Sequence, residues 1–314
     1  MAPAGPRSWP PGGAELAGSG HSTSGTDALQ AADSGPIAKG DPMAETAYLG
    51  FASRDGELLH RYGDHVHLIH DPLALTWLAR LSHPACVQPE VNRLVTLLYR
   101  GLVRETMNRQ FPRRVVRTET RMRTYTDRGY YEGQILDPET EVTTVDIARA
   151  GILPSMVCFE ALCEVLDPTR VRQDHILMNR TTNDQMQVTG AGMHGRKIAG
   201  PVKDRILVFP DPMGATGGSL AEAIRFYMEE LDGPPAHIYA LNLIVTPEFI
   251  KRLTTQFPGK VSIFAYRLDR GLSPDSVLQA LPGEHWDLEK GLTDQQYIVP
   301  GAGGMGEIMN NALT

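Results

Sequence analysis

Between residues 142 and 266, short apolar runs alternate with longer amphipathic segments, and this alternation constrains the fold more than any other feature. The pattern predicts strands over 142–148, 175–178, 205–209, 237–245 and 261–266, and helices over 154–166, 219–231 and 247–257. Strands that alternate with helices imply right-handed crossovers and a mainly parallel sheet. We therefore expect an α/β domain that binds its ligands at the carboxyl ends of the strands.

The remaining segments suggest one domain preceded by a tail. Residues 1–45 are rich in Gly, Pro, Ala and Ser, with too few apolar side chains to offset the entropy of ordering. We predict a disordered tail there and a single domain over 46–314. Leucines recur at helical spacing after Pro89, and Thr, Tyr and Val dominate residues 114–145. These patterns predict an amphipathic helix followed by a β-rich excursion, whereas residues 180–203 read as a polar excursion.

Charge and cysteine content narrow the functional class. The formal net charge of −7 argues against a nucleic-acid binder, although a charged small substrate remains compatible with it. The three cysteines form no CxxC pair, no apolar run approaches the roughly 20 residues of a membrane span, and the opening residues do not resemble a secretion signal. We expect a cytoplasmic protein that binds neither nucleic acid nor membrane.

The stretch "FPDPMGATGGS", residues 209–219, carries the chemistry. Asp211 follows a predicted strand, and the loop from Ala215 to Ser219 leads into a predicted helix. Free backbone amides and the helix dipole make such a helix start an anion site. The glycines allow close approach of the backbone to a phosphate, and Thr216 and Ser219 add hydroxyl groups. The spacing matches neither a Walker loop nor GxGxxG. An acid four residues before "ATGGS" is suited to hold ribose hydroxyls or to act through magnesium.

Three motifs in order resemble the uracil phosphoribosyltransferases. "DPMGATGGS" is similar to the family's phosphoribosyl-diphosphate loop, DPMLATGGS. "YIVPGAGGMGE", residues 297–307, resembles its C-terminal signature GYIVPGLGDAGD, and "IARAGILPSM", residues 147–156, resembles ILRAGLGM. Two further segments show a weaker similarity to the family, "NLIVTPEFIKRL" and "HDPLALTWLARL". The resemblance covers roughly residues 64 to 310 and implies a phosphoribosyltransferase-type parallel sheet flanked by helices, with a β-rich excursion and a C-terminal hood.

The resemblance also implies an activity and a set of site residues. The family transfers ribose 5-phosphate from phosphoribosyl diphosphate to a nitrogen of uracil and releases pyrophosphate. By position, Asp211 would be the catalytic residue, Arg149 and Arg180 would contact pyrophosphate, and Mg²⁺ would bind through the diphosphate without a protein metal site. The donor would be held by Asp211, Pro212, Met213, Gly214, Ala215, Thr216, Gly217, Gly218 and Ser219, and the base by Tyr297, Ile298, Gly303, Gly304 and Met305. Family members associate, so we expect a homodimer or higher homo-oligomer.

Several positions depart from the family pattern. Gly304 stands where the family has an acid that contacts the donor, Met305 replaces a small alanine, and Gly214 replaces a leucine. Residues 273–291 look inserted. Three explanations stay open: Glu307 reaches into the vacated place, the base differs from uracil, or the chain is a non-catalytic regulator that senses a nucleotide through the donor site.

Other residues have competing interpretations. Residues 269–271 line a pocket or form a turn. The histidines at 60, 65, 67 and 70 resemble a metal site in number, but two of them alternate on one strand face without an acid pair, so we expect no metal there. His194 is expected to be a solvated loop histidine.

Overall fold

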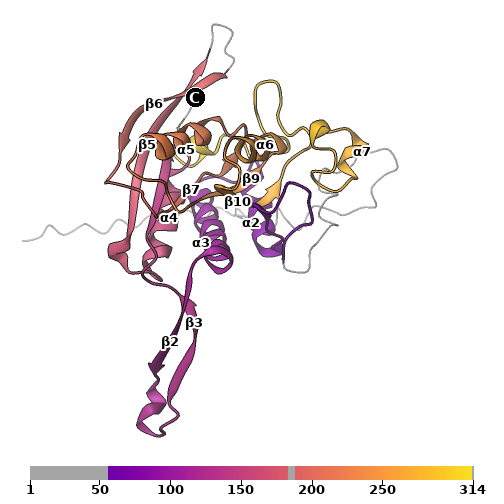
Figure 1. Cartoon of the computed structure of the whole chain (residues 1–314). Helices are drawn as coiled ribbons and strands as arrows, with labels where there is room; N and C mark the ends of the chain where they lie inside the picture. Colours follow the sequence, from indigo (N-terminus) through magenta and orange to yellow (C-terminus); the bar gives the residue numbers. More distant parts are fainter. Residues whose placement is uncertain (1–55, 183–187, 313–314) are drawn as a thin grey trace, which may run out of the picture. The chain divides into compact units, whose positions relative to one another are not determined.

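A mainly parallel sheet organises the chain, whose computed structural model describes residues 56–182 and 188–312 (Figure 1). Its described strands are β1 (Val66–Leu68), β4 (Val142–Ala148), β5 (Val171–Thr182), β6 (Val188–Lys197), β7 (Ile206–Pro210), β8 (Met213–Gly214), β9 (His237–Val245) and β10 (Val261–Leu268). The order is β1-β10-β9-β7-β4-β5-β6, with β8 beside β9. Only the β5–β6 pair is antiparallel among these strands. The expected α/β class is confirmed, whereas the predicted tail over 1–45 lies outside the described residues.

Helices cover both faces of this sheet. One core contains buried residues of α2 (Pro72–Ser82), α3 (Glu90–Gln110) and α4 (Ile152–Cys163), and a second contains those of α5 (Gly218–Glu229) and α6 (Pro247–Gln256). Successive strand residues alternate between the two cores: Phe264 packs in the first and Ile263 in the second. Because both faces are covered, the strands read as continuous apolar runs in the sequence.

Local signals explain where two of these helices begin. Asp71 Oδ1 accepts hydrogen bonds from the backbone amides of Leu73 and Ala74 at 2.9 and 3.1 Å, directly before Pro72 of α2. Thr246 Oγ1 accepts one from Phe249 N at 3.1 Å, directly before the proline that opens α6. Both are side-chain N-caps followed by proline at the first helical position.

The segments outside the predicted alternation contain more strand than expected. β2 (Arg113–Glu119) and β3 (Tyr130–Leu136) pair antiparallel in a separate sheet, with the short helix η2 (Arg121–Thr124) between them, and this hairpin projects away from the central sheet (Figure 1). The expected β-rich excursion is confirmed. The polar excursion predicted over 180–203 is wrong in part, because β5 runs to Thr182 and β6 returns beside it. His194 is exposed, but it lies on β6 rather than in a loop.

The C-terminal part is held by buried ion pairs. It contains the short helices α7 (Asp275–Leu278), η4 (Trp286–Leu288) and α8 (Met305–Ile308). A further short helix, η3 (Pro168–Arg170), precedes β5. Asp269 is fully buried and accepts hydrogen bonds from Arg267 Nε at 2.6 Å and Gly301 N at 2.7 Å. Arg270, also fully buried, donates to Glu289 Oε1 at 2.6 Å. Residues 269–271 therefore have structural partners that anchor the inserted segment: Gly271 forms a β-bridge with Lys290, and a turn follows in which Ser273 N donates to the carbonyl oxygen of Arg270 at 3.0 Å. None of the described helices is both long and apolar enough to cross a membrane.

Candidate functional site

Three sequence motifs meet at the carboxyl edge of the sheet around the turn that follows β4. A Cβ at Gly151 would lie 3.1 Å from the carbonyl oxygen of Pro210, at the end of β7, and 2.8 Å from Ile147 N. A Cβ at Gly306 would lie 3.7 Å from Ala150 Cβ. Ala150 thus lies against the C-terminal segment, and the next residue, Gly151, lies against the end of β7, which leads into the "DPMGATGGS" loop. Arg149 precedes them after a cis peptide bond and contacts Glu307 of the C-terminal segment.

The loop after β7 is shaped by its own acid. Asp211 Oδ1 accepts a hydrogen bond from Met213 N at 2.9 Å, which closes an Asx turn. The buried Asn242 on β9 donates from Nδ2 to the carbonyl oxygen of Asp211 at 2.7 Å. Gly217 has φ of 72°, in the left-handed region, and immediately precedes α5. The loop therefore delivers the start of a three-turn helix to the edge of the sheet, beside the Asp211 carboxylate.

The rest of this loop is fastened to β9 and α6. The carbonyl oxygen of Pro212 accepts from Leu243 N and Ile244 N, both at 3.1 Å, and that of Ala215 accepts from Thr246 Oγ1 at 2.7 Å. A Cβ at Gly214 would lie 2.9 Å from Val245 Cγ1 and 3.1 Å from Phe249 Cγ. Gly214 is buried, so the leucine expected from the family pattern has no room there. Thr216 Oγ1 accepts from Gly218 N at 3.3 Å, and Ser219 lies half-buried in the first turn of α5.

The place of the missing acid at position 304 is filled by another carboxylate. A Cβ at Gly304 would lie 2.7 Å from Glu307 Oε2, because α8 brings residue 307 back over residue 304. The other oxygen, Glu307 Oε1, accepts a hydrogen bond from Arg149 Nη2 at 3.0 Å. The two side chains are 36% and 51% exposed, so the ion pair is open to solvent and to ligands.

The predicted base-binding residues differ in how far they are exposed to solvent. Tyr297 is 65% exposed, and Gly303 is exposed with φ of 79°. Ile298 is half-buried against the core, and Met305 is 2% exposed within it. Met305 is thus a core side chain in this structure, whereas Tyr297, Gly303 and Gly304 face outward.

The structure describes only the backbone of Arg180. It lies on β5, paired with Ala191 of β6, three residues beyond Leu177, which pairs with Ala148. β5 therefore continues past the level at which β4 ends, toward the side of the sheet where Arg149 lies. The side chain of Arg180 lies outside the described part of the chain.

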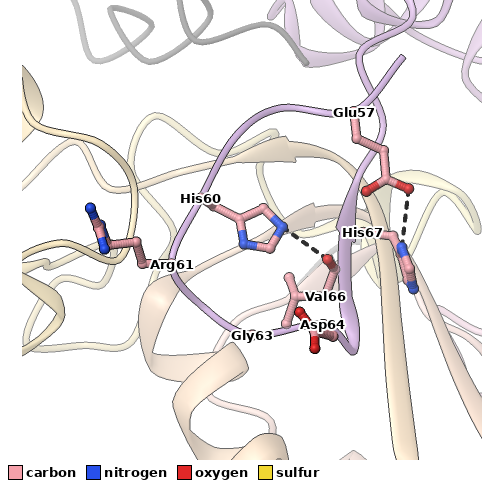
Figure 2. Close-up of a pocket in the computed structure, with 7 residues that line it drawn as sticks. All are labelled: Glu57, His60, Arg61, Gly63, Asp64, Val66 and His67. Carbon is pink, nitrogen blue, oxygen red and sulfur yellow. Dashed lines mark hydrogen bonds and ion pairs between the residues drawn. The ribbon is translucent and has the colours of Figure 1, made fainter. Parts of the chain in front are cut away.

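The histidines near the start of the described chain have structural partners. His60 Nε2 contacts the carbonyl oxygen of Val66 at 2.9 Å, and His67 Nδ1 pairs with Glu57 at 3.0 Å, within an open pocket beside the edge strand β1 (Figure 2). Burial lowers the pKa of His60. Across residues 56–182 and 188–312, no three His, Cys, Asp or Glu side chains are grouped to hold a metal ion.

Two positioning residues were missed by the sequence analysis. Asn242 interrupts the apolar run of β9 and holds the backbone of Asp211, so a polar residue within a buried strand was the available signal. Thr246 joins the loop to α6, and the sequence shows only its capping role before proline.

Comparison with known proteins bears on the family and the fold of the chain. A family model described as "Uracil phosphoribosyltransferase" matches residues 68–283, more than half of the chain. A uracil phosphoribosyltransferase of Thermococcus sibiricus is 29% identical over 154 residues, which cover 48% of this chain and 60% of that protein. One of Caldanaerobacter subterraneus is 34% identical over 111 residues, covering 35% of this chain and 41% of that protein. The matches thus span less than two thirds of these relatives.

A solved structure matches over a longer stretch. The AQ2163 protein from Aquifex aeolicus aligns with a TM-score of 0.59 and 21% identity, over 79% of this chain and 99% of that one. At this identity the likeness concerns the fold alone.

Proposed function

Because the chain belongs to the uracil phosphoribosyltransferase family, we propose that it transfers ribose 5-phosphate from phosphoribosyl diphosphate to a ring nitrogen of uracil or a uracil-like heterocycle. The products are the nucleoside monophosphate and pyrophosphate. One observation carries the proposal: Gly151 lies against Pro210, directly before the loop of residues 211–219, and Ala150 lies against Gly306 of the segment of residues 297–307, all at one edge of the sheet. A donor and an acceptor base bound at this edge would share Arg149 between them.

The donor's 5-phosphate binds where α5 begins. Backbone amides around Gly217, Gly218 and Ser219 and the positive end of the helix dipole attract the anion. Thr216 Oγ1, which accepts from Gly218 N without ligand, is within the same turn and turns its hydroxyl to the phosphate. Asp211 contacts the ribose hydroxyls with the carboxylate that the Asx turn orients.

Displacement at C1 of the sugar requires charge stabilisation more than proton transfer. The transition state develops positive charge on the sugar, while a polyanion departs. Arg149 holds the departing pyrophosphate with its planar guanidinium, which matches two phosphate oxygens, and Arg180 on the extended β5 adds a second cation. Mg²⁺ bound through the diphosphate would neutralise part of this charge.

Glu307 takes the place of the family's acid at position 304. Its carboxylate occupies the space in which a side chain at 304 would begin, and it holds Arg149 until donor binds. The arriving diphosphate competes with Glu307 for Arg149, and the released carboxylate is then free to face the sugar. The chain thereby keeps one acid at the reacting centre.

The base lies against the exposed members of residues 297–304. Tyr297 and Gly303 are open to solvent, and an irregular glycine-rich segment presents backbone donors and acceptors that suit a planar heterocycle. Met305 is buried, so its side chain does not line the base site, and the exposed backbone at residues 303 and 304 is left to contact the base. We propose that this backbone hydrogen-bonds to a pyrimidine-like base.

A second candidate function follows from Gly304 itself. If Glu307 does not act on the donor, the site retains its phosphate loop with Asp211 but lacks the acid of the C-terminal segment, as a nucleotide-sensing regulator would. Mixing the pure protein with phosphoribosyl diphosphate, Mg²⁺ and a panel of pyrimidine-like bases separates the two functions. Release of pyrophosphate with one of the bases supports the enzyme. Donor binding without release of pyrophosphate with any base supports the regulator.

We propose further that the protein is a cytoplasmic homodimer or higher homo-oligomer. The β2–β3 hairpin supports association, since an isolated two-stranded sheet is marginally stable and this one exposes Val115, Met122 and Tyr125. Light scattering coupled to gel filtration measures the oligomeric state, and a monomer at micromolar concentration would contradict the proposal.

A further inference from the structure

The two glycines that open α5 lie against a side chain that no motif marks, Arg252 on the second turn of α6. A Cβ at Gly217 would lie 3.5 Å from Arg252 Cδ, and one at Gly218 would lie 2.9 Å from Arg252 Nη1. The left-handed backbone of Gly217 favours glycine by itself, whereas Gly218 has no such backbone requirement. The glycine at position 218 therefore preserves the space that the guanidinium occupies.

α6 is fastened to the loop, so the backbone that carries Arg252 is held beside the start of α5. Thr246 donates its hydroxyl to the carbonyl oxygen of Ala215 and caps α6 at the same time. Phe249, three residues before Arg252 and hence on the same helix face, packs against Gly217, with its Cδ2 3.3 Å from the Cβ position there. The loop and the first two turns of α6 thus form one packed unit.

The charge of Arg252 is not balanced by a carboxylate. Arg252 is exposed, and within residues 56–182 and 188–312 it forms no ion pair, whereas the nearby cations Arg225 and Lys251 pair with Glu222 and Asp287. A cation beside the start of a helix meets the positive end of the helix dipole, which is unfavourable without an anion. An anion at this place is attracted by both groups and removes the repulsion between them.

We propose that Arg252 binds the 5-phosphate of the donor from the side of α6, so that the phosphate lies between the guanidinium and the amides of the loop. The inference rests on the proposed function, because it adds a residue to the same donor site. Arginine suits this role, since its fork donates two parallel hydrogen bonds to a phosphate.

Calorimetric titration with ribose 5-phosphate, phosphoribosyl diphosphate and pyrophosphate, each with Mg²⁺, tests the assignment. Arg252→Gln is expected to weaken ribose 5-phosphate and the donor by about tenfold or more, the usual effect of losing hydrogen bonds to a charged group. Pyrophosphate affinity should stay unchanged, because pyrophosphate lacks the 5-phosphate. Arg225→Gln is the matched control, since it removes the same charge about 10 Å further along α5 and should leave all three affinities unchanged.

A second variant tests whether the position of the Arg252 guanidinium matters as well as its charge. Gly218→Ala keeps Arg252 but puts a methyl group 2.9 Å from its Nη1, so the guanidinium has to move away. The substitution should weaken ribose 5-phosphate binding in the otherwise unaltered protein and much less in the Arg252→Gln background. Full ribose 5-phosphate affinity in Arg252→Gln, or additive effects of the two substitutions, would overturn the role of Arg252 and leave the proposed function standing. Binding of none of the three probes by the unaltered protein would overturn both.

Discussion

The carboxylate of Glu307 lies where a side chain at position 304 would begin: Oε2 is 2.7 Å from the Cβ position of Gly304. The opposite oxygen binds Arg149 at 3.0 Å. A carboxylate is thus present at the place where the family pattern has one, although it is attached one helical turn later in the chain. By alignment Glu307 matches the second acid of the family's GDAGD pattern, so the chain retains one of the two acids, and its carboxylate lies beside the position of the lost one.

Exchange of the two positions tests this relationship. Glu307→Ala should lower the rate of pyrophosphate release by about 100-fold, the effect of removing one group that stabilises charge at a reacting centre. Gly304→Asp added to Glu307→Ala should recover much of the rate, because the alanine vacates the space and the φ of −77° at residue 304 accommodates a side chain.

Gly304→Asp alone serves as the control for that exchange. Its side chain would collide with the Glu307 carboxylate and repel it, so the single variant should be less active than the unaltered protein. A double variant no faster than Glu307→Ala would contradict the assignment of Glu307.

The turn that joins the three motifs should be intolerant of a single methyl group. Gly151→Ala places a Cβ within 2.8 Å of Ile147 N and 3.1 Å of Pro210 O, and overpacking of this kind costs about 1–3 kcal/mol of unfolding free energy. Urea denaturation measures the cost. Gly306→Ala, whose Cβ would have an ordinary 3.7 Å contact with Ala150, is the control and should lose little. Equal stability of the two variants would show that the turn is less closely packed than described.

The inserted segment should depend on one buried ion pair. Arg270 and Glu289 are paired at 2.6 Å with fully buried side chains, and Tyr62 also donates to Glu289 at 2.5 Å. Glu289→Gln leaves the arginine charge without its counter-charge and should destabilise the protein by about 3–5 kcal/mol. Asp287→Asn, in the exposed pair with Lys251 nearby, should have no measurable effect on the urea midpoint. A stable Glu289→Gln protein would contradict this role.

Part of the acid sensitivity should come from His237. Burial, with smaller contributions from the neighbouring His65 and Lys260, lowers the pKa of His237 below the usual histidine value of 6.5. The unfolded chain therefore binds a proton at a higher pH than the folded chain does, and stability falls as the pH drops below about 6.5. Above that value the contribution is fully retained. His237→Gln should make the unfolding free energy depend less on pH between 7.5 and 5.5, and an unchanged dependence would contradict the assignment.

Most of the fold was predictable because strands buried on both faces leave long apolar runs. β4 and β9 were predicted with the bounds that the structure has, and β7 within one residue at each end. The β5–β6 pair was not predicted, since residues such as Gly192 and Gly195 interrupt any alternation, and its pairing depends on a partner strand rather than on local pattern. The class of the fold thus followed from periodicity, whereas the extensions of the sheet did not.

The site was predictable where one local motif contains the chemistry. The loop of residues 211–219 carries its acid, its glycines and its helix start within nine residues, so the sequence shows them together. Thr246 and Arg252 lie on a different segment and meet the loop only through the packing of α6. The contact between position 304 and Glu307 could not be predicted from the sequence, because it depends on how α8 brings residue 307 back over residue 304.

Calorimetric titration of phosphoribosyl diphosphate with Mg²⁺ into the unaltered protein and into Asp211→Asn tests the central claim most directly. We predict saturable one-to-one binding by the unaltered protein, weakened at least about tenfold in the variant, because Asp211 shapes the loop and, in our proposal, contacts the ribose. No heat with the unaltered protein, or equal affinity in both proteins, would contradict the claim that this loop binds the sugar phosphate.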